Sequence, residues 1–224
     1  MLGGSERLLP VALDVTDGAQ VQAAVDHALE RVGRIDVLVN NAGHGLVGAV
    51  EEASAEETRS VFAVNVDGLL ALTRAVLPSM RARHEGRIIN LSCGGGLTAT
   101  PGFGVYAATK FAVEGLSKAM HAELKPLGIE VIILKVEPGI FRTDFLDPSS
   151  LHRASRVIDD YASTCGMTRQ WAAATNHEQP GDPAKAAAAI IAVATSPSPP
   201  LRLQLGAYSV ARRRPVSAQR TDIR

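Results

Sequence analysis

Short apolar runs that alternate with helical patterns restrict the fold of this chain more than any other feature. Strands that alternate with helices argue for a parallel sheet with right-handed crossover connections. We therefore expect a doubly wound α/β fold, formed as a single domain over residues 1–211. The strand-like runs lie at residues 8–13, 35–40, 87–92, 131–136 and 201–205.

Capping residues support the helical intervals between these runs. Asp17 with Gln20 resembles a capping box ahead of an amphipathic helix. Ser54 with Glu57 forms a second capping box, ahead of a long helical stretch. Asp182, which a proline follows, is expected to cap the last helix.

The composition is that of an ordinary globular protein and excludes several kinds of partner. Hydrophobic residues make up 46% of the 224 residues, and the formal net charge is zero. A neutral chain gives no electrostatic reason to expect nucleic acid or an anionic membrane as a partner. We find no signal peptide and no apolar run near the roughly 20 residues that span a bilayer, so we expect a cytoplasmic protein. The arginine-rich end, residues 212–224, is expected to be a basic, disordered tail.

Tyr106 and Lys110 are the residues that point most directly to chemistry. They lie four residues apart in a helical pattern, so their side chains share one helix face. A phenol titrates at about pH 10 and transfers protons poorly at neutral pH, whereas a neighbouring ammonium favours the phenolate. The pair is therefore a candidate acid/base group. For an isolated Y-x-x-x-K match, a plain pair on a helix surface is the alternative.

Three other segments carry polar or turn-forming residues at suggestive places. Residues 40–43 (NNAG) follow the apolar run at 35–39, and Pro138 and Gly139 follow the run that begins at residue 131. Asn65 lies among apolar residues in a helical pattern, where a buried carboxamide needs hydrogen-bonding partners. Open α/β sheets bind ligands beyond the carboxyl ends of their strands.

In this order and spacing, the segments resemble the short-chain dehydrogenase/reductase family over about residues 5–210. The resemblance implies a Rossmann-like sheet and a nicotinamide cofactor, NAD or NADP. It implies that Tyr106 is the catalytic acid/base, that Lys110 binds the nicotinamide ribose and lowers the pKa of the tyrosine, and that Asn65 anchors a proton-relay water. We expect these residues and Cys93 to meet in one pocket at the carboxyl ends of the strands.

The same resemblance assigns further residues to the cofactor. It places Asp14 against the adenine and Thr143 against the nicotinamide carboxamide. A turn or helix-cap role is the alternative for Asp14, a plain turn for residues 41–43, and a satisfied core residue for Asn65. The implied cofactor-binding residues are Asp14, Asn41, Ala42, Gly43, Tyr106, Lys110, Pro138, Gly139 and Thr143.

Cys93 departs from the family pattern. A serine that orients the substrate carbonyl is expected thirteen residues before the tyrosine, and that position holds Cys93, with Ser92 beside it. Neighbouring side chains at a strand end point to opposite sides, so Ser92 cannot take the place of Cys93 without a local shift. A thiol is a weak hydrogen-bond donor, which predicts reduced turnover. The alternative is that Cys93 is an inert small residue.

The family's T-G-x-x-x-G-x-G loop is not found in the 224 residues. We expect a Rossmann-like sheet that lacks the family's first two strands and this glycine-rich loop. Residues 8–13 would then lack a sheet neighbour, residues 35–39 would form an exposed apolar edge, and NAD(P) binding would be weakened.

The predicted function is that of an oxidoreductase. It would transfer a hydride between NAD(P) and a carbonyl/secondary alcohol substrate, in a homodimer or homotetramer. The motif-rich segment resembles retinol- and hydroxysteroid-type members of the family. The histidines show no metal-ligand spacing, so no metal is expected. The alternative is a non-catalytic remnant that keeps only the oligomerisation surface of the family.

Overall fold

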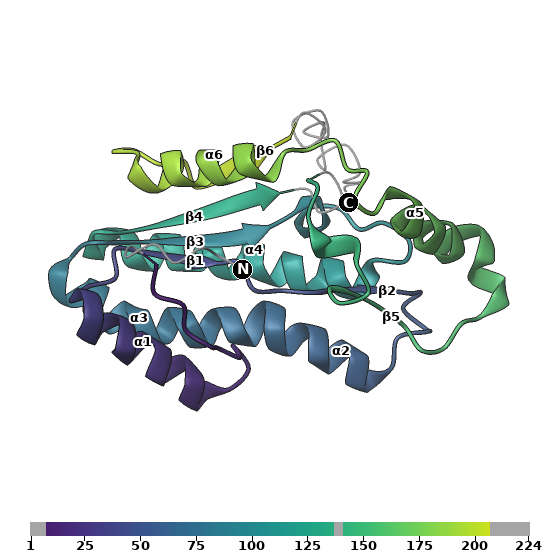
Figure 1. Cartoon of the computed structure of the whole chain (residues 1–224), viewed down its shortest axis with the longest axis horizontal. Helices are drawn as coiled ribbons and strands as arrows, with labels where there is room; N and C mark the ends of the chain where they lie inside the picture. Colours follow the sequence, from purple (N-terminus) through teal and green to yellow (C-terminus); the bar gives the residue numbers. More distant parts are fainter. Residues whose placement is uncertain (1–7, 137–140, 207–224) are drawn as a thin grey trace, which may run out of the picture.

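The computed structural model describes residues 8–136 and 141–206, and a parallel sheet of four strands forms its centre (Figure 1). The strands lie in the order β1-β3-β4-β6, and each pair of neighbours is parallel. Four of the five predicted strands are therefore confirmed, within a few residues at their ends. Their bounds are β1 (Val37–Asn40), β3 (Gly86–Ser92), β4 (Ile129–Val136) and β6 (Arg202–Leu205).

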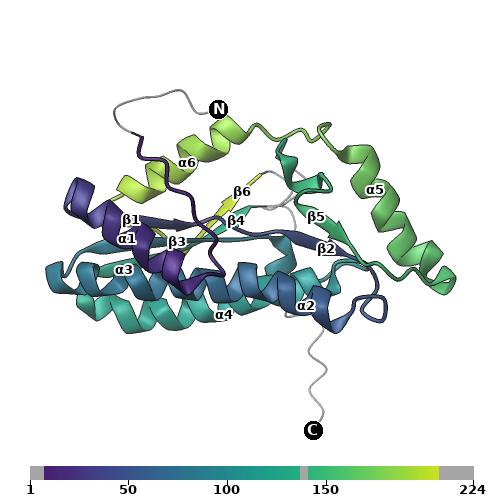
Figure 2. The same ribbon diagram turned by 60° about the horizontal axis from the view of Figure 1, so that its bottom comes forward.

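Helices cover both faces of the sheet (Figures 1 and 2). The helices α1, α3 and α4 pack on one face, and α6 lies on the other. The predicted caps are present: Asp17 caps α1, Ser54 with Glu57 forms a capping box on α2, and Asp182 caps α6. The helix bounds are α1 (Gly18–Val32), α2 (Ala55–Phe62), α3 (Leu69–Arg83), α4 (Gly104–Leu124), α5 (Met167–Thr175) and α6 (Pro183–Thr195).

The core has one cluster of apolar side chains on each face of the sheet. Ile88 on β3 packs with Met80 and Val113 beneath the sheet. The next residue, Ile89, faces the other way and packs with Val193 on α6. Because side chains alternate along a strand, a strand that is covered on both faces buries consecutive apolar residues, as β3 does at Ile88 and Ile89 and β4 does at residues 131–134.

The predicted strand at residues 8–13 is wrong. These residues are irregular, and Leu8 and Leu9 are 50% and 41% exposed. A strand requires a neighbour that pairs with its N–H and C=O groups, and residues 8–13 pair with none of the described strands. Over the described ranges, β1 is an edge of the sheet, where Val39 remains 40% exposed. The apolar edge that the sequence predicts for residues 35–39 is thus present.

A second, smaller sheet lies beyond the carboxyl ends of the main strands. The strands β2 (Gly45–Val47) and β5 (Leu151–Arg153) pair in parallel, and α5 lies near them at the same end of the molecule (Figure 2). The strand β5 and α5 belong to residues 144–181, where the sequence shows little periodicity. We call residues 144–181 the covering segment.

One described helical stretch, Ala55–Arg83, is long and apolar enough to cross a membrane by length and composition. In this fold its apolar residues have another role. Val61, Val76 and Met80 are almost completely buried in the domain, as in the core helix of a globular protein. The predicted tail, residues 212–224, lies outside the described residues.

Candidate active site

The site begins where β1 and β3 end side by side. Their register pairs Asn40 with Asn90, so the residues that follow each strand emerge at the same edge of the sheet. Residues 41–43 follow β1 and are exposed, whereas Cys93 follows β3 and is only 1% exposed. An exposed segment and a buried thiol therefore follow two neighbouring strands at the same edge of the sheet.

A π-helical turn places Asn65. The turn, Ala63–Gly68, joins α2 to α3, and the side chain of Asn65 within it is buried. A π-turn widens the helix by one residue and often occurs at functional sites. The sequence predicts a continuous helix through this region and gives no signal for the wider turn.

The carboxamide of Asn65 is fully engaged. Its Oδ1 accepts a hydrogen bond from the backbone N–H of His44 at 3.0 Å, and its Nδ2 donates to the carbonyl of His44 at 3.0 Å. Nδ2 also donates to Oγ1 of Thr109 at 3.1 Å. The side chain of Asn65 therefore joins the turn after β1 to helix α4.

Tyr106 and Lys110 lie on the same face of α4, near its first turn. Both are largely buried, and Nζ of Lys110 is 5.7 Å from the centroid of the Tyr106 ring. Nζ donates a hydrogen bond to the carbonyl of Leu91 on β3 at 3.0 Å. A Cβ added to Gly43 would lie 2.9 Å from Oδ1 of Asn65 and 3.8 Å from Nζ of Lys110. The turn after β1 thus contacts both side chains.

Burial lowers the pKa of Lys110, and the nearby thiol of Cys93 acts in the opposite direction. A buried ammonium is costly unless charge or hydrogen bonds compensate it. An ammonium has three N–H donors, and the contact with Leu91 uses one. Among the described residues, this is the one hydrogen bond that Nζ donates.

Ser92 and Cys93 lie against different glycines of the loop that follows β3. Oγ of Ser92 is buried and has no hydrogen-bond partner among the described residues. It lies beneath Gly96, where an added Cβ would be 2.5 Å from Oγ and 3.0 Å from Cγ of Glu114. Sγ of Cys93 lies instead by Gly95, where an added Cβ would be 3.1 Å from it.

The other residues that the sequence assigns to the cofactor are less closely connected. The carboxylate of Asp14 accepts hydrogen bonds from the backbone N–H and the hydroxyl of Thr16, and these two bonds lower the pKa of Asp14. Thr143 is exposed, and its hydroxyl caps the short turn that follows it. Pro138 and Gly139 lie outside the described residues.

Two aromatic rings flank Tyr106, and the sequence did not single them out. The ring of Phe145, from the covering segment, lies 5.5 Å from the Tyr106 ring between centroids. The ring of Phe103 lies 6.1 Å away. Both are half-buried, so the space around the phenol is apolar on these sides. Trp171 and Met167, two large side chains of the covering segment, are instead 44% and 62% exposed.

The covering segment is fastened to the rest of the site by several contacts. The ring of His152 stacks on that of His44 at 4.3 Å between centroids, and burial together with His44 lowers the pKa of His152. Glu52, in the loop after β2, forms a buried ion pair with Arg169 on α5. An acidic residue in a polar stretch of sequence looks like a surface residue, so no sequence signal could have identified Glu52.

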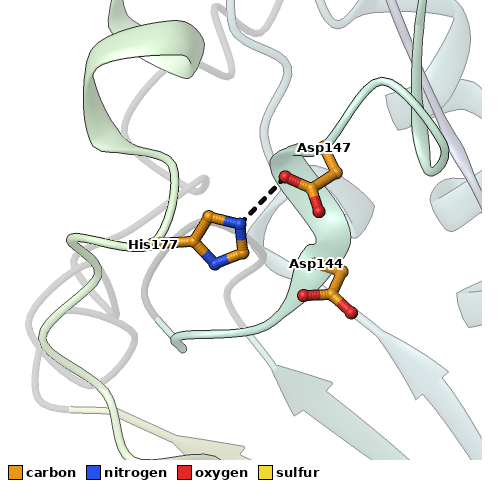
Figure 3. Close-up of side chains that lie close together, drawn as sticks. All are labelled: Asp144, Asp147 and His177. Atoms are coloured by element: carbon orange, nitrogen blue, oxygen red, sulfur yellow. Dashed lines mark hydrogen bonds and ion pairs between the residues drawn. The ribbon is translucent and has the colours of Figure 1, made fainter.

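One group of metal-binding residue types occurs in the described parts of the chain. Asp144, Asp147 and His177 bring one ligand atom each within 4.8 Å of one another (Figure 3). Oδ1 of Asp147 is already bound by Nε2 of His177 at 3.0 Å and by the amide of Asn176. These contacts tie the two ends of the covering segment together, which is a sufficient reason for the cluster.

Comparisons with known proteins connect this geometry to a family. The family model described as short chain dehydrogenase matches residues 2–154. A 3-ketodihydrosphingosine reductase of Bacteroides thetaiotaomicron is 39% identical over 204 residues, which are 91% of this chain and 74% of the relative.

Two solved structures extend the comparison. A short-chain dehydrogenase from Streptomyces avermitilis is 44% identical, with a TM-score of 0.80 over 90% of this chain and 71% of the other. A gluconate 5-dehydrogenase from Burkholderia cenocepacia, in complex with NADP and tartrate, is 35% identical. Its TM-score is 0.56 over 61% of this chain and 53% of the other.

Proposed function

The chain belongs to the short-chain dehydrogenase family, and from that premise we propose that it is an NAD(P)-dependent oxidoreductase acting on a carbonyl/secondary alcohol pair. The observation that carries the proposal is the meeting of Asn65, Cys93, Tyr106 and Lys110 at the carboxyl ends of the strands. The Bacteroides relative is named as the reductase of a keto compound, and the Burkholderia enzyme was crystallised with NADP. Both agree with the proposal.

Tyr106 is the proposed acid/base. Its phenol would give a proton to the substrate oxygen during reduction of a ketone and take it back during oxidation of an alcohol. The Lys110 ammonium lies close enough to the ring to stabilise the negative charge that develops when the proton leaves. Burial of both groups strengthens this interaction, because the surroundings screen charge less than water does.

The remaining residues orient the reactants. The spare N–H groups of Lys110 and the exposed turn, residues 41–43, would hold the ribose of the cofactor. A nicotinamide bound there would supply or accept the hydride. Cys93 would contact the substrate carbonyl with a weak donor. Asn65 would keep the turn and helix α4 in place, and a water-binding role for it remains part of the proposal.

Reduction of ketones by NADH and by NADPH, followed at the absorbance of the reduced cofactor, tests the proposal. We expect Tyr106→Phe to lower kcat by about 100- to 10,000-fold, the range for loss of an acid/base group. Tyr161→Phe is the matched control, because Tyr161 also loses a hydroxyl, one that donates to Glu51 on the surface. Full activity in Tyr106→Phe would contradict the assignment.

A wild-type chain that oxidises neither cofactor with any ketone of a broad panel would contradict the proposed function itself. The comparisons give no support to the alternative of a non-catalytic chain. Assembly as a homodimer or homotetramer remains a prediction from the resemblance, and a cytoplasmic location remains a prediction from the sequence pattern.

A further inference from the structure

Thr109 lies at the junction of three segments of the proposed site. Its side chain is 0% exposed, one residue before Lys110 on α4. Oγ1 donates to the carbonyl of Tyr106 at 2.7 Å and accepts from Nδ2 of Asn65 at 3.1 Å. A hydroxyl has one proton, so the bond to Tyr106 commits it and leaves the lone pairs for Asn65.

This arrangement fixes the orientation of the Asn65 carboxamide. One N–H of Nδ2 points to Thr109 and the other to the carbonyl of His44, while Oδ1 receives the N–H of His44. A flipped carboxamide would place its oxygen against the His44 carbonyl and its nitrogen against the His44 N–H. Thr109 offers that oxygen no proton, because its own is used elsewhere. The hydroxyl thus selects the single orientation in which every group is paired.

The same hydroxyl links the first turns of α4 to Asn65. The carbonyl that it holds belongs to Tyr106, whose ring lies 5.7 Å from Nζ of Lys110. Asn65, on the other side, is held by the turn after β1. A rigid chain of hydrogen bonds therefore runs from that turn, through Asn65 and Thr109, to the backbone of Tyr106.

We propose that Thr109 is a positioning residue that sets the placement of Tyr106 relative to the turn after β1 and to Lys110. The proposal rests on the proposed function, in which Tyr106 transfers the proton. Thr109 itself contacts neither substrate nor cofactor. Its effect on turnover arises because a displacement of about 1 Å at a reacting group can cost as much as about 100-fold in rate.

Thr73 provides a matched control. It is also buried, at 1% exposed, and its Oγ1 also accepts a hydrogen bond from an asparagine amide, Nδ2 of Asn40 at 3.2 Å. Thr73 lies on α3, and neither it nor its partner Asn40 is one of the residues assigned to catalysis or to the cofactor. Thr109→Val and Thr73→Val each remove a buried hydroxyl that accepts a hydrogen bond from an asparagine amide, and Thr109→Val also removes the bond to the Tyr106 carbonyl.

The experiment compares Thr109→Val, Thr109→Ser and Thr73→Val in the full chain. We expect the unfolding midpoint in urea to fall by a similar amount in both valine variants. Only Thr109→Val should lower kcat, by about tenfold or more, with little change in KM for the cofactor. Thr109→Ser keeps the hydroxyl and should restore kcat. Equal kcat in the two valine variants, at equal stability, would overturn the proposal.

A second readout does not depend on activity. The side-chain amide of Asn65, identified by its disappearance in Asn65→Asp, should exchange its protons slowly in the wild type and in Thr73→Val. In Thr109→Val we expect faster exchange and a shifted nitrogen resonance. An unchanged Asn65 signal in Thr109→Val would overturn the proposal even if the wild-type chain reduces no ketone, which separates this outcome from failure of the proposed function.

Discussion

Glu52 should be the residue whose removal most affects the covering segment. Its side chain is 0% exposed, and its carboxylate accepts backbone N–H groups from Ala49 at 2.6 Å and from Ile158 at 2.9 Å. The guanidinium of Arg169, whose side chain is 13% exposed, forms an ion pair with the same carboxylate. One carboxylate therefore holds the loop after β2, the middle of the covering segment and helix α5.

The magnitude follows from what Glu52→Ala leaves behind. Removal of one partner of a buried ion pair typically costs about 3–5 kcal/mol, because the remaining charge is uncompensated. Since Arg169 keeps slight access to water, we expect the lower end, about 3 kcal/mol. In Glu52→Gln a neutral oxygen still accepts a backbone N–H, and loss of the charge-assisted bonds should cost about 1.5–3 kcal/mol.

The assay must separate local opening from global unfolding. Hydrogen exchange read by mass spectrometry should show faster exchange in residues 156–175 of Glu52→Ala, while strands β3 and β4 change little. KM for the ketone should rise, because Phe145 and its segment cover the phenol. Exchange and KM that remain at wild-type values in Glu52→Ala would refute this reasoning.

The pH dependence gives an independent check. Burial acts to raise the pKa of Glu52, but the N–H groups of Ile158 and Ala49 and the charge of Arg169 outweigh it and lower the pKa. A lowered pKa means that the carboxylate stabilises the fold above the ordinary value of 4.5 and loses that contribution as the pH falls through the lower, folded value. After correction for the intrinsic exchange rate at each pH, the wild-type protection of residues 156–175 should fall in acid, and Glu52→Gln should lack this dependence.

Three further changes have defined outcomes. Asn90→Ala removes a completely buried carboxamide that accepts a hydrogen bond from Asn40 at 2.8 Å. The free energy of unfolding in urea should fall by about 2–4 kcal/mol, because the change leaves unpaired polar groups and a cavity. A loss below about 1 kcal/mol would contradict this account. Cys93→Ser supplies a stronger donor and should raise kcat by about tenfold or more while changing cofactor affinity little, as steady-state kinetics would show; a lower kcat would speak against a carbonyl contact. Gly128→Ala should lower the melting temperature markedly, because φ is 74° and the added Cβ would lie 2.1 Å from the His84 carbonyl; an unchanged melting temperature would mean that this turn relaxes freely.

Local sequence was sufficient where a structure depends on near neighbours. The caps at Asp17 and Ser54 are correct because each bonds to N–H groups within three residues. Tyr106 and Lys110 share a face because the helical period places residues four apart together. The apolar runs at residues 87–92 and 131–136 correctly predicted the strands β3 and β4, which lie in the centre of the sheet and bury side chains on both of its faces.

The sequence misled us where a structure needs a distant partner. Residues 8–13 have a strand-like pattern, but no described strand pairs with them, and they remain irregular. The strands β2 and β5 were missed for the opposite reason. Each has only three residues, and each is a strand only because it pairs with the other, as Gly45 does with Leu151, which is far away along the chain. The pattern of a single segment contains no information about such a meeting.

The class of fold, the family and the shared helix face of Tyr106 and Lys110 could be predicted from the sequence alone. Each of them depends on local periodicity or on an ordered set of motifs. How the site is held together depends instead on tertiary packing. A π-turn brings Asn65 to His44 and Thr109, and a buried carboxylate at Glu52 fastens the covering segment. These contacts join residues that are 21, 44 and 117 positions apart, and whether such groups meet depends on how the helices pack on the sheet.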